Sequence, residues 1–423
     1  MTLSLLLMQI AVIIAACWLV RRAMVPLRQP PVMGEILAGL LLGPSFFGWI
    51  APQAYASLFP SSSLPALHGL SQIGLVVFMF LVGLRLDLSE VYAHRRVAGL
   101  SAFLSILLPF AIGLGLASFL YPFAASGTAK LPFQLFIAIS MSITAFPVLA
   151  RILTDRGLDS TRLGHVAISC AAVDDVTAWC LLAVTTAMAK SADGGSFSVA
   201  PLITVAAYVL LMGLPVRLAL RALSARVAFS RHFPLILIFV FLSSWATESL
   251  GIHALFGAFL AGVIWPRQAG LVDEISRRLE PFAMAILIPL FFSYTGIRTN
   301  MGLLAGGLWI YALAVIALAV AGKAGGAFCG ARLMGFGLRD SLALGCLLNT
   351  RGLVELIVLN VGLDLGILSP ALFSIMVLMA LTTTMMAAPA LALILPEGFR
   401  TERPPSQALG LTSNTVAPGS SGE

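Results

Sequence analysis

Two adjacent aspartates, Asp174 and Asp175, lie at the centre of an apolar stretch that runs from Ala167 to Ala183. An ionised carboxylate in an apolar medium is costly, so a buried charge is normally paired or functional. Adjacent residues of a helix project about 100° apart, so these two carboxylates cannot both face one partner. No single fixed cation would neutralise both of them, and a passing cation or proton is the simplest completion. We therefore take Asp174 and Asp175 as the candidate site for a monovalent cation and a proton.

Three more charged residues fall inside apolar segments. Lys323 is the only lysine in any predicted membrane span and is the natural partner of one aspartate, in a structural or a functional salt bridge. Arg351 and Glu355 stand four residues apart, which allows an ion pair on one helix face. We favour a structural role for this self-neutralising pair. Glu35, at the start of an apolar segment, is a borderline member of the set.

The chain that carries these residues has the composition of a polytopic membrane protein. Its 423 residues are 59% hydrophobic and 10% charged, whereas soluble domains carry about 25% charge. A helix needs about 20 apolar residues to cross a bilayer, and cutting the sequence at charges, prolines and glycines predicts thirteen spans. The predicted spans are 3–20, 31–50, 65–84, 97–121, 131–151, 162–189, 200–223, 233–250, 252–265, 281–297, 303–331, 340–361 and 370–394.

The basic residues predict the orientation of these spans. With the N-terminus outside, twenty of the 25 Lys and Arg fall in inner loops and the tail, and only Lys130, Lys190 and Arg298 fall in outer loops. Positive charge is enriched on the cytoplasmic side of membrane proteins. We therefore expect a multi-pass protein of the cell's inner (plasma) membrane, with a cytoplasmic C-terminus. The net charge of +7 follows from this placement and needs no nucleic acid partner.

Two predicted spans are interrupted by residues that disfavour a helix. Ser140–Pro147 places hydroxyls and a proline in the middle of the fifth span, and Leu348–Leu353 interrupts the twelfth. Irregular backbone at this depth is tolerated only where it is buried in protein or lines a cavity. Each break lies in the second span of a triplet, either spans four to six or spans eleven to thirteen. This pattern indicates a transport site between inverted repeats.

The domain organisation predicted from the sequence is simple. Residues 1–395 form one transmembrane domain, because the predicted spans follow one another with short connections. Residues 396–423 are rich in Ser, Pro, Thr and Gly and are predicted to form a disordered cytoplasmic tail.

Four segments carry a pattern known from one protein family. They are Gln29–Ser45 (QPPVMGEILAGLLLGPS), Thr144–Arg151 (TAFPVLAR), Ala171–Asp175 (AAVDD) and Asn349–Asn360 (NTRGLVELIVLN). In this order they resemble the monovalent cation:proton antiporter-2 family, whose members are sodium/hydrogen exchanger-like. The last two are most similar to the branch that contains plant cation/proton exchangers and their bacterial relatives. The resemblance covers nearly the whole chain, from about residue 5 to residue 395.

The resemblance implies an all-α fold of inverted repeats with two crossed broken helices. It implies a core, residues 97–189 and 303–394, that moves against a dimerisation domain, and hence a homodimer. It places the ion and proton site at Asp175, with Asp174 beside it, and makes Lys323 a salt-bridge partner of an aspartate. The family often has asparagine at the position of Asp174, and in related antiporters a paired aspartate usually accompanies electrogenic exchange. Asp174 together with Lys323 therefore favours electrogenic exchange here.

Residues and resemblance together predict a secondary transporter, not an enzyme, that exchanges Na⁺ or K⁺ for protons by alternating access. A cation and a proton that compete for one buried carboxylate, open to each side in turn, produce obligate exchange. We expect oxygens of Thr144, Asn349 and Thr350 to complete the ion's shell, because hard cations prefer oxygen ligands. We expect no cofactor, and the partners are the transported cations, protons and the lipid bilayer.

Three other functions compete with this prediction. An intramembrane aspartyl protease needs two carboxylates from different helices, whereas Asp174 and Asp175 are adjacent and diverge. A sodium-coupled symporter of a small organic anion would have a larger substrate cavity and no need for Lys323. A channel or sensor would keep the same core without obligate coupling.

Overall fold

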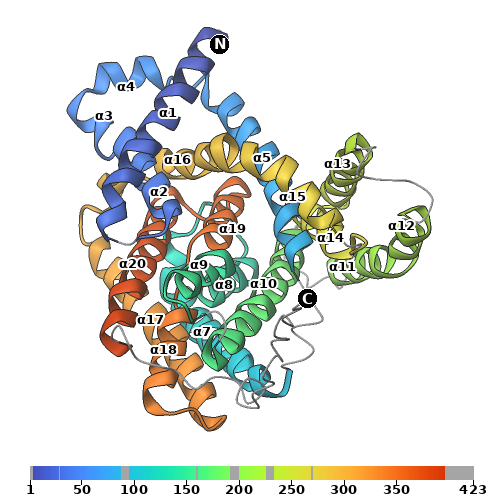
Figure 1. Ribbon diagram of the computed structural model, residues 1–423. Coiled ribbons are helices and arrows are strands. Elements are labelled where there is room, and N and C mark those ends of the chain that lie inside the picture. Colours follow the sequence, from blue (N-terminus) through green and yellow to red (C-terminus); the bar gives the residue numbers. More distant parts are fainter. Residues whose placement is uncertain are drawn as a thin grey trace, which may run out of the picture.

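The computed structural model of the chain is built of helices that cross one another at several angles (Figure 1). It describes residues 3–27, 29–86, 95–158, 161–190, 200–224, 233–267 and 270–395. Within these ranges the ordered elements are all helical. The predicted tail, residues 396–423, lies outside the described residues.

Nine α-helices lie between Leu3 and Lys190, and ten lie between Ala200 and Ile394. The first are α1 (Leu3–Met24), α2 (Pro31–Leu42), α3 (Phe47–Ile50), α4 (Pro52–Leu58), α5 (Leu64–Arg85), α7 (Arg95–Leu120), α8 (Lys130–Ser142), α9 (Phe146–Asp155) and α10 (Arg162–Lys190). The others are α11 (Ala200–Leu211), α12 (Arg217–Ser224), α13 (Phe233–Ser249), α14 (Ala254–Ile264), α15 (Leu271–Phe282), α16 (Ile288–Arg298), α17 (Leu308–Leu333), α18 (Leu338–Leu348), α19 (Leu353–Asp364) and α20 (Pro370–Ile394). These counts refer to the described residues alone.

Short turns of other helix types extend some of these elements. Three are 3₁₀ turns: η1 (Val25–Leu27), η2 (Tyr121–Phe123) and η5 (Met301–Leu304). Two are π-helical and join α11 to α12 and α15 to α16: η3 (Met212–Val216) and η4 (Ala283–Leu287). The turn η3 contains Pro215, and η4 begins two residues after Pro281. A proline has no N–H group to donate, so a continuous α-helix would lose a hydrogen bond at each of these prolines.

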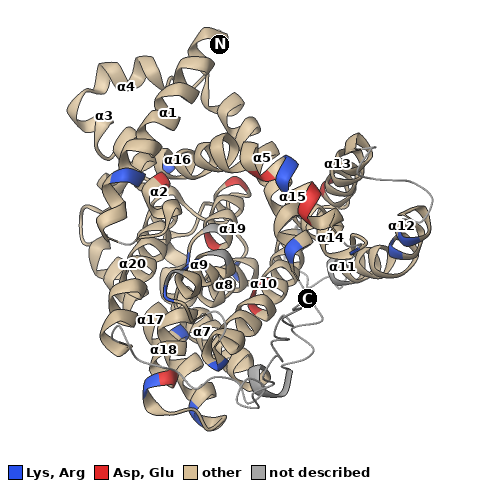
Figure 2. Cartoon of the chain, in the orientation of Figure 1, with Lys and Arg blue, Asp and Glu red and all other residues tan. Residues whose placement is uncertain are grey.

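The predicted spans coincide with helices of the structure. Among the described residues, nine helical segments are long and apolar enough to cross a membrane. The other predicted spans correspond to the short apolar helices α13 and α14 and to the broken pairs α8–α9 and α18–α19. Charged residues are sparse along the helices (Figure 2). The predicted all-helical membrane fold is confirmed, whereas the number of crossings stays a prediction.

The helices pack in two groups. Helices α7–α10 and α17–α20 pack chiefly against one another, and we call them the core bundle. The flanking helices, α1–α5 and α11–α16, pack through the pairs α5–α14, α2–α16 and α13–α14. In Figure 1 the core bundle fills the lower part of the view, and α5 and α16 run across its upper edge. The division of the chain into a moving core and a dimerisation domain stays a prediction.

A stripe of small residues brings α17 against α7. The stripe consists of Gly322, Gly326 and Gly330. Small residues let helix backbones approach closely in a membrane, and a Cβ atom on Gly326 would lie 2.3 Å from the carbonyl oxygen of Leu104. The contact also brings Lys323 of α17 within reach of α7, where its Nζ donates a hydrogen bond to the Ser105 carbonyl at 3.0 Å.

We expect Gly326→Ala to lower the thermal stability of the purified full chain, because the methyl group overlaps the α7 backbone. Overpacking of this kind costs about 1–3 kcal/mol. The matched control is Gly325→Ala, since a Cβ atom there meets nothing closer than Leu108 Cδ2 at 3.8 Å. Thermal unfolding in detergent measures both. Equal midpoints for the two variants would contradict the close α7–α17 contact.

Candidate ion-binding site

The first broken helix consists of α8 and α9. α8 ends at Ser142, α9 begins at Phe146, and the backbone of Ile143 and Ala145 between them is extended. Pro147, the proline of this interrupted span, is the second residue of α9, where its missing N–H group costs no hydrogen bond. The break therefore lies just before the proline, at residues that include Thr144, with its hydroxyl group, and Ala145, with its small side chain.

The second broken helix consists of α18 and α19, which end and begin at Leu348 and Leu353. Gly352, in the connection, has a φ of +153°, which residues with a side chain rarely adopt. The two breaks meet: the Ala145 N–H donates to the Thr350 carbonyl at 2.9 Å. Each break therefore supplies hydrogen-bond partners to the other, as irregular backbone inside a membrane requires.

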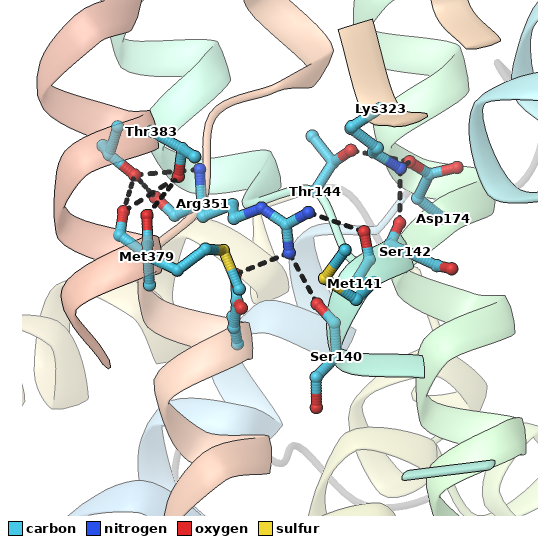
Figure 3. Close-up of polar contacts among 12 residues, drawn as sticks. Ser140, Met141, Ser142, Thr144, Asp174, Lys323, Arg351, Met379 and Thr383 are labelled. Atoms are coloured by element: carbon cyan, nitrogen blue, oxygen red, sulfur yellow. Dashed lines mark hydrogen bonds and ion pairs between the residues drawn. The ribbon is translucent and has the colours of Figure 1, made fainter. Parts of the chain in front are cut away.

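Lys323 pairs with Asp174 at this crossing (Figure 3). Nζ lies 2.5 Å from Asp174 Oδ2, and both side chains are fully buried. The ammonium group also donates to the carbonyls of Ser105 and of Ser142, the last residue of α8. The Thr144 hydroxyl donates to the same Oδ2 at 2.7 Å. A buried charge is tolerable only with such complete pairing, and here the three ammonium donors all have acceptors.

Arg351 approaches the same helix end from the other side (Figure 3). Its guanidinium group donates to the carbonyls of Ser140 at 2.5 Å and Met141 at 2.6 Å. The predicted pair with Glu355 is present at 3.1 Å, with both side chains buried. Thr384 of α20 bonds the backbone of Arg351 through both its N–H and its carbonyl group. Two cations thus meet the carbonyl end of α8, where the helix dipole favours positive charge.

Asp175 has a different environment from its neighbour. It is 2% exposed, and its Oδ1 atom is buried with no hydrogen-bond partner among the described residues. Asn349, in the facing break, has a buried Oδ1 in the same state. An unsatisfied buried polar atom costs roughly 1–3 kcal/mol. These two oxygen atoms are therefore buried acceptors without a hydrogen-bond donor.

The structure brings some predicted site residues together and leaves others apart. Thr144 contacts Asp174 directly and also reaches the Leu348 carbonyl of the facing break at 2.9 Å. Thr350 lies in that break, but its hydroxyl donates to the Leu347 carbonyl at 2.8 Å. Neither Thr350 nor Asn349 has a hydrogen bond to an aspartate within the described part of the chain. Their oxygen atoms keep lone pairs for an ion.

Two further observations concern residues around this site. Ser105, which the sequence analysis did not select, lies 3.4 Å from Asp174 Oδ1 through its hydroxyl; its one signal was a polar residue within an apolar span. Glu35, the borderline candidate, is buried on α2 and pairs with Arg21 of α1 at 3.3 Å. The ion-pair partner of Glu35 therefore lies on another flanking helix. Among the described residues, no hydrogen bond or ion pair joins Glu35 to Lys323.

A cavity of about 260 Å³ lies between the core bundle and the flanking helices. Its core-bundle wall includes Phe146, the first residue after the break in the α8–α9 pair, and Ala150. Its flanking wall includes Arg85 of α5 and Glu280 of α15, which form a salt bridge. The cavity therefore lies beside the start of α9, at the end of α5 that carries Arg85.

Comparison with known proteins identifies the family. The family described as sodium/hydrogen exchanger, transmembrane, matches residues 10–396 of the chain. The chain belongs to the sodium/hydrogen exchanger family. Among its relatives, the Na⁺/H⁺ antiporter NhaS4 of Synechocystis is 42% identical over 402 residues, which cover 93% of this chain and 98% of that protein. Cation/H⁺ antiporter 17 of Arabidopsis thaliana is 37% identical over 402 residues, or 94% of this chain, which spans about half (49%) of that relative.

A solved structure shares the fold. The sodium proton antiporter MjNhaP1 of Methanocaldococcus jannaschii superposes with a TM-score of 0.66 at 17% identity, over 95% of this chain and 100% of that chain. The family predicted from the four sequence motifs is therefore confirmed. The exchanger family consists of transporters, so the protease alternative is wrong, and the chain is a multi-pass membrane transporter.

We expect Lys323→Met to lower the free energy of unfolding by roughly 3–5 kcal/mol, because it leaves the buried Asp174 without a counter-charge. The double variant Asp174→Asn/Lys323→Met removes both charges and is expected to recover most of this loss. Arg278→Met is the control: it breaks the exposed Arg278–Glu274 pair on α15, which is worth at most about 1 kcal/mol. A single Lys323→Met variant that melts like the control would contradict the structural importance of the pair.

Proposed function

We propose that the chain exchanges a monovalent cation, Na⁺ before K⁺, for protons at Asp175 by alternating access. The observation that carries this proposal is the unequal pairing of the two aspartates. Lys323 already neutralises Asp174 at 2.5 Å, whereas Asp175 Oδ1 is buried without a hydrogen-bond partner among the described residues. The uncompensated carboxylate is the one that an exchangeable ion can occupy.

Coupling follows from competition for that carboxylate. A proton and a dehydrated cation cannot both be held by Asp175, so each displaces the other. When the site opens to one side at a time, the displaced ion leaves on the side then open, and exchange is obligatory. We propose that the Asn349 amide oxygen and the hydroxyls of Thr144 and Thr350 complete the cation's shell, since they are hard oxygen ligands.

We propose that the core bundle moves against the flanking helices to change the side from which Asp175 is reached. The cavity supports this proposal, because it lies along their boundary and approaches the first break through Phe146. It opens at the end of the molecule that carries Arg85, a residue of a predicted inner loop, so the described conformation faces the cytoplasm. The N-terminus then lies outside, in the cell's plasma membrane, and the flanking helices form the interface of a homodimer.

We also propose that the exchange is electrogenic. Asp174 supplies a second carboxylate beside Asp175. The ammonium group of its partner Lys323 donates to Asp174 Oδ2 and to the Ser105 carbonyl. If cation binding opens the Lys323–Asp174 pair, more than one proton can be exchanged for one cation. The cycle then moves net charge across the membrane.

The first test of the exchange is Asp175→Asn in the full chain. We expect this variant to insert normally and to lose cation-driven proton release, because the amide cannot hold a proton or compensate a cation. Inverted vesicles acidified by respiration, with a quenched dye as reporter, measure release after sodium, potassium, lithium or rubidium salts are added. Asp273→Asn, an identical change at an exposed position on α15, is the matched control and should behave like the parent chain. Retained release in Asp175→Asn would remove Asp175 from the mechanism.

Charge movement is tested separately in proteoliposomes that carry an imposed membrane potential. We expect the parent chain's exchange rate to rise with a potential of one sign and to fall with the other. Asp174→Asn removes one titratable carboxylate, so its rate should respond less to the potential. A parent rate that is the same at both signs of potential would show that exchange is electroneutral and that Asp174 has another role.

A further inference from the structure

A second charged cluster spans the boundary between the core bundle and the flanking helices. Arg298, the last residue of α16, lies 2.7 Å from Asp364 Oδ1 through Nη2. Its Nη1 donates to Asn360 Oδ1 at 3.2 Å. His68 Nε2, near the start of α5, lies 3.2 Å from Asp364 Oδ2. Both oxygens of Asp364 therefore have a partner on the flanking helices.

An aromatic ring holds the two flanking partners together. The ring of Tyr294 stacks on His68 with centroids 5.3 Å apart and an interplanar angle of 14°. The Arg298 guanidinium lies 5.5 Å from the centroid of the same ring. Since Tyr294 and Arg298 both belong to α16, the ring fixes the directions from which His68 and Arg298 approach the carboxylate.

The cluster lies at the end of the boundary opposite the cavity. His68 is near the first residue of α5, whereas Arg85, which lines the cavity, is its last residue. The pair at the cavity end, Arg85–Glu280, joins two flanking helices, so motion of the core bundle need not break it. The pairs made by Asp364 join α19 of the core bundle to α5 and α16, so a displacement of that bundle separates them.

More polar contacts cross the boundary at the same end. The Asn360 amide donates to the Thr295 hydroxyl of α16 at 2.7 Å. Beyond α16, the Asn300 N–H donates to the hydroxyl of Ser374 on α20 at 3.0 Å. The boundary is thus closed by directional polar contacts at one end and holds a cavity at the other.

We propose that His68, Arg298 and Asp364 form an outer latch: positioning residues that hold the transporter closed toward the outside and must separate before Asp175 is exposed there. This inference rests on the proposed exchange function, because the latch needs a core bundle that moves. Its energy sets the balance between the inward-facing and outward-facing states and so the apparent affinity for a cation on each side.

Asp364 carries the negative charge of the latch. Burial tends to raise the pKa of Asp364, but the hydrogen bond from His68 and the charge of Arg298 outweigh burial and hold it below its usual range. Asp364 is therefore ionised near neutral pH. His68 Nε2 lies 3.2 Å from Asp364 Oδ2 and 2.8 Å from the Gln72 amide nitrogen.

The sign of the Asp364 contribution follows from its lowered pKa. The carboxylate pairs with His68 and Arg298 while it is ionised, and its contribution is lost as pH falls through that pKa. Acid strong enough to protonate Asp364 therefore weakens the latch.

The first experiment compares Asp364→Asn with the parent chain in oriented proteoliposomes. We expect the half-saturating sodium concentration to fall at the outer face and to rise at the inner face, each by about twofold to fivefold, the range for a partly exposed ion pair. Arg278→Gln, which breaks the exposed pair within α15, is the control and should change neither value. Unchanged values on both sides in Asp364→Asn would overturn the latch, since a purely structural contact has no reason to act oppositely on the two faces.

A second experiment locks the latch covalently. The double variant His68→Cys/Asp364→Cys, in a background without the native cysteines, is oxidised to a disulfide. We expect exchange to stop on oxidation and to return with a reductant, whereas each single variant continues to exchange under oxidation. Undiminished exchange by a double variant shown to be crosslinked would overturn the latch. Absence of cation-driven exchange in the parent chain itself would instead contradict the proposed function.

Discussion

The buried ion pair between Lys323 and Asp174 is the interaction on which the rest of the structure depends. An ammonium group inside a membrane protein is tolerable only when its donors are all satisfied. Here the acceptors come from three helices: Asp174 of α10, the Ser105 carbonyl of α7 and the Ser142 carbonyl of α8. Lys323 can reach them because glycines on α17 let its backbone approach α7 closely. The pair therefore fixes the packing of the core bundle as well as the charge at its centre.

Each broken helix supplies hydrogen-bond partners to the other. The Ala145 N–H and the Thr144 hydroxyl of the first break bond carbonyls of the second. Arg351, from the second break, bonds the last carbonyls of α8. With the fixed charges engaged in this way, Asp175 Oδ1 keeps no hydrogen-bond partner among the described residues, which is why we propose Asp175 as the carboxylate for the mobile ion.

The boundary between the core bundle and the flanking helices is asymmetric. A cavity occupies it at one end, whereas a histidine, an arginine and a carboxylate close it at the other. Alternating access needs this difference, because one side must open while the other is sealed. A latch of partly exposed groups suits a boundary that opens repeatedly: each contact is weak, and water can replace it at small cost.

The sequence by itself determined the membrane fold, the two interrupted helices, the buried charged residues and the Arg351–Glu355 pair. Composition, helix periodicity and the cost of burying charge are local properties that one chain displays. Tertiary structure decided which aspartate Lys323 neutralises, because that depends on the rotation and contact of α10 and α17. It also set the first break at residues 143–145, within the predicted stretch Ser140–Pro147, and it joined Arg298, expected in an outer loop, to Asp364. These outcomes depend on how separate helices pack, and no spacing along a single segment contains that information.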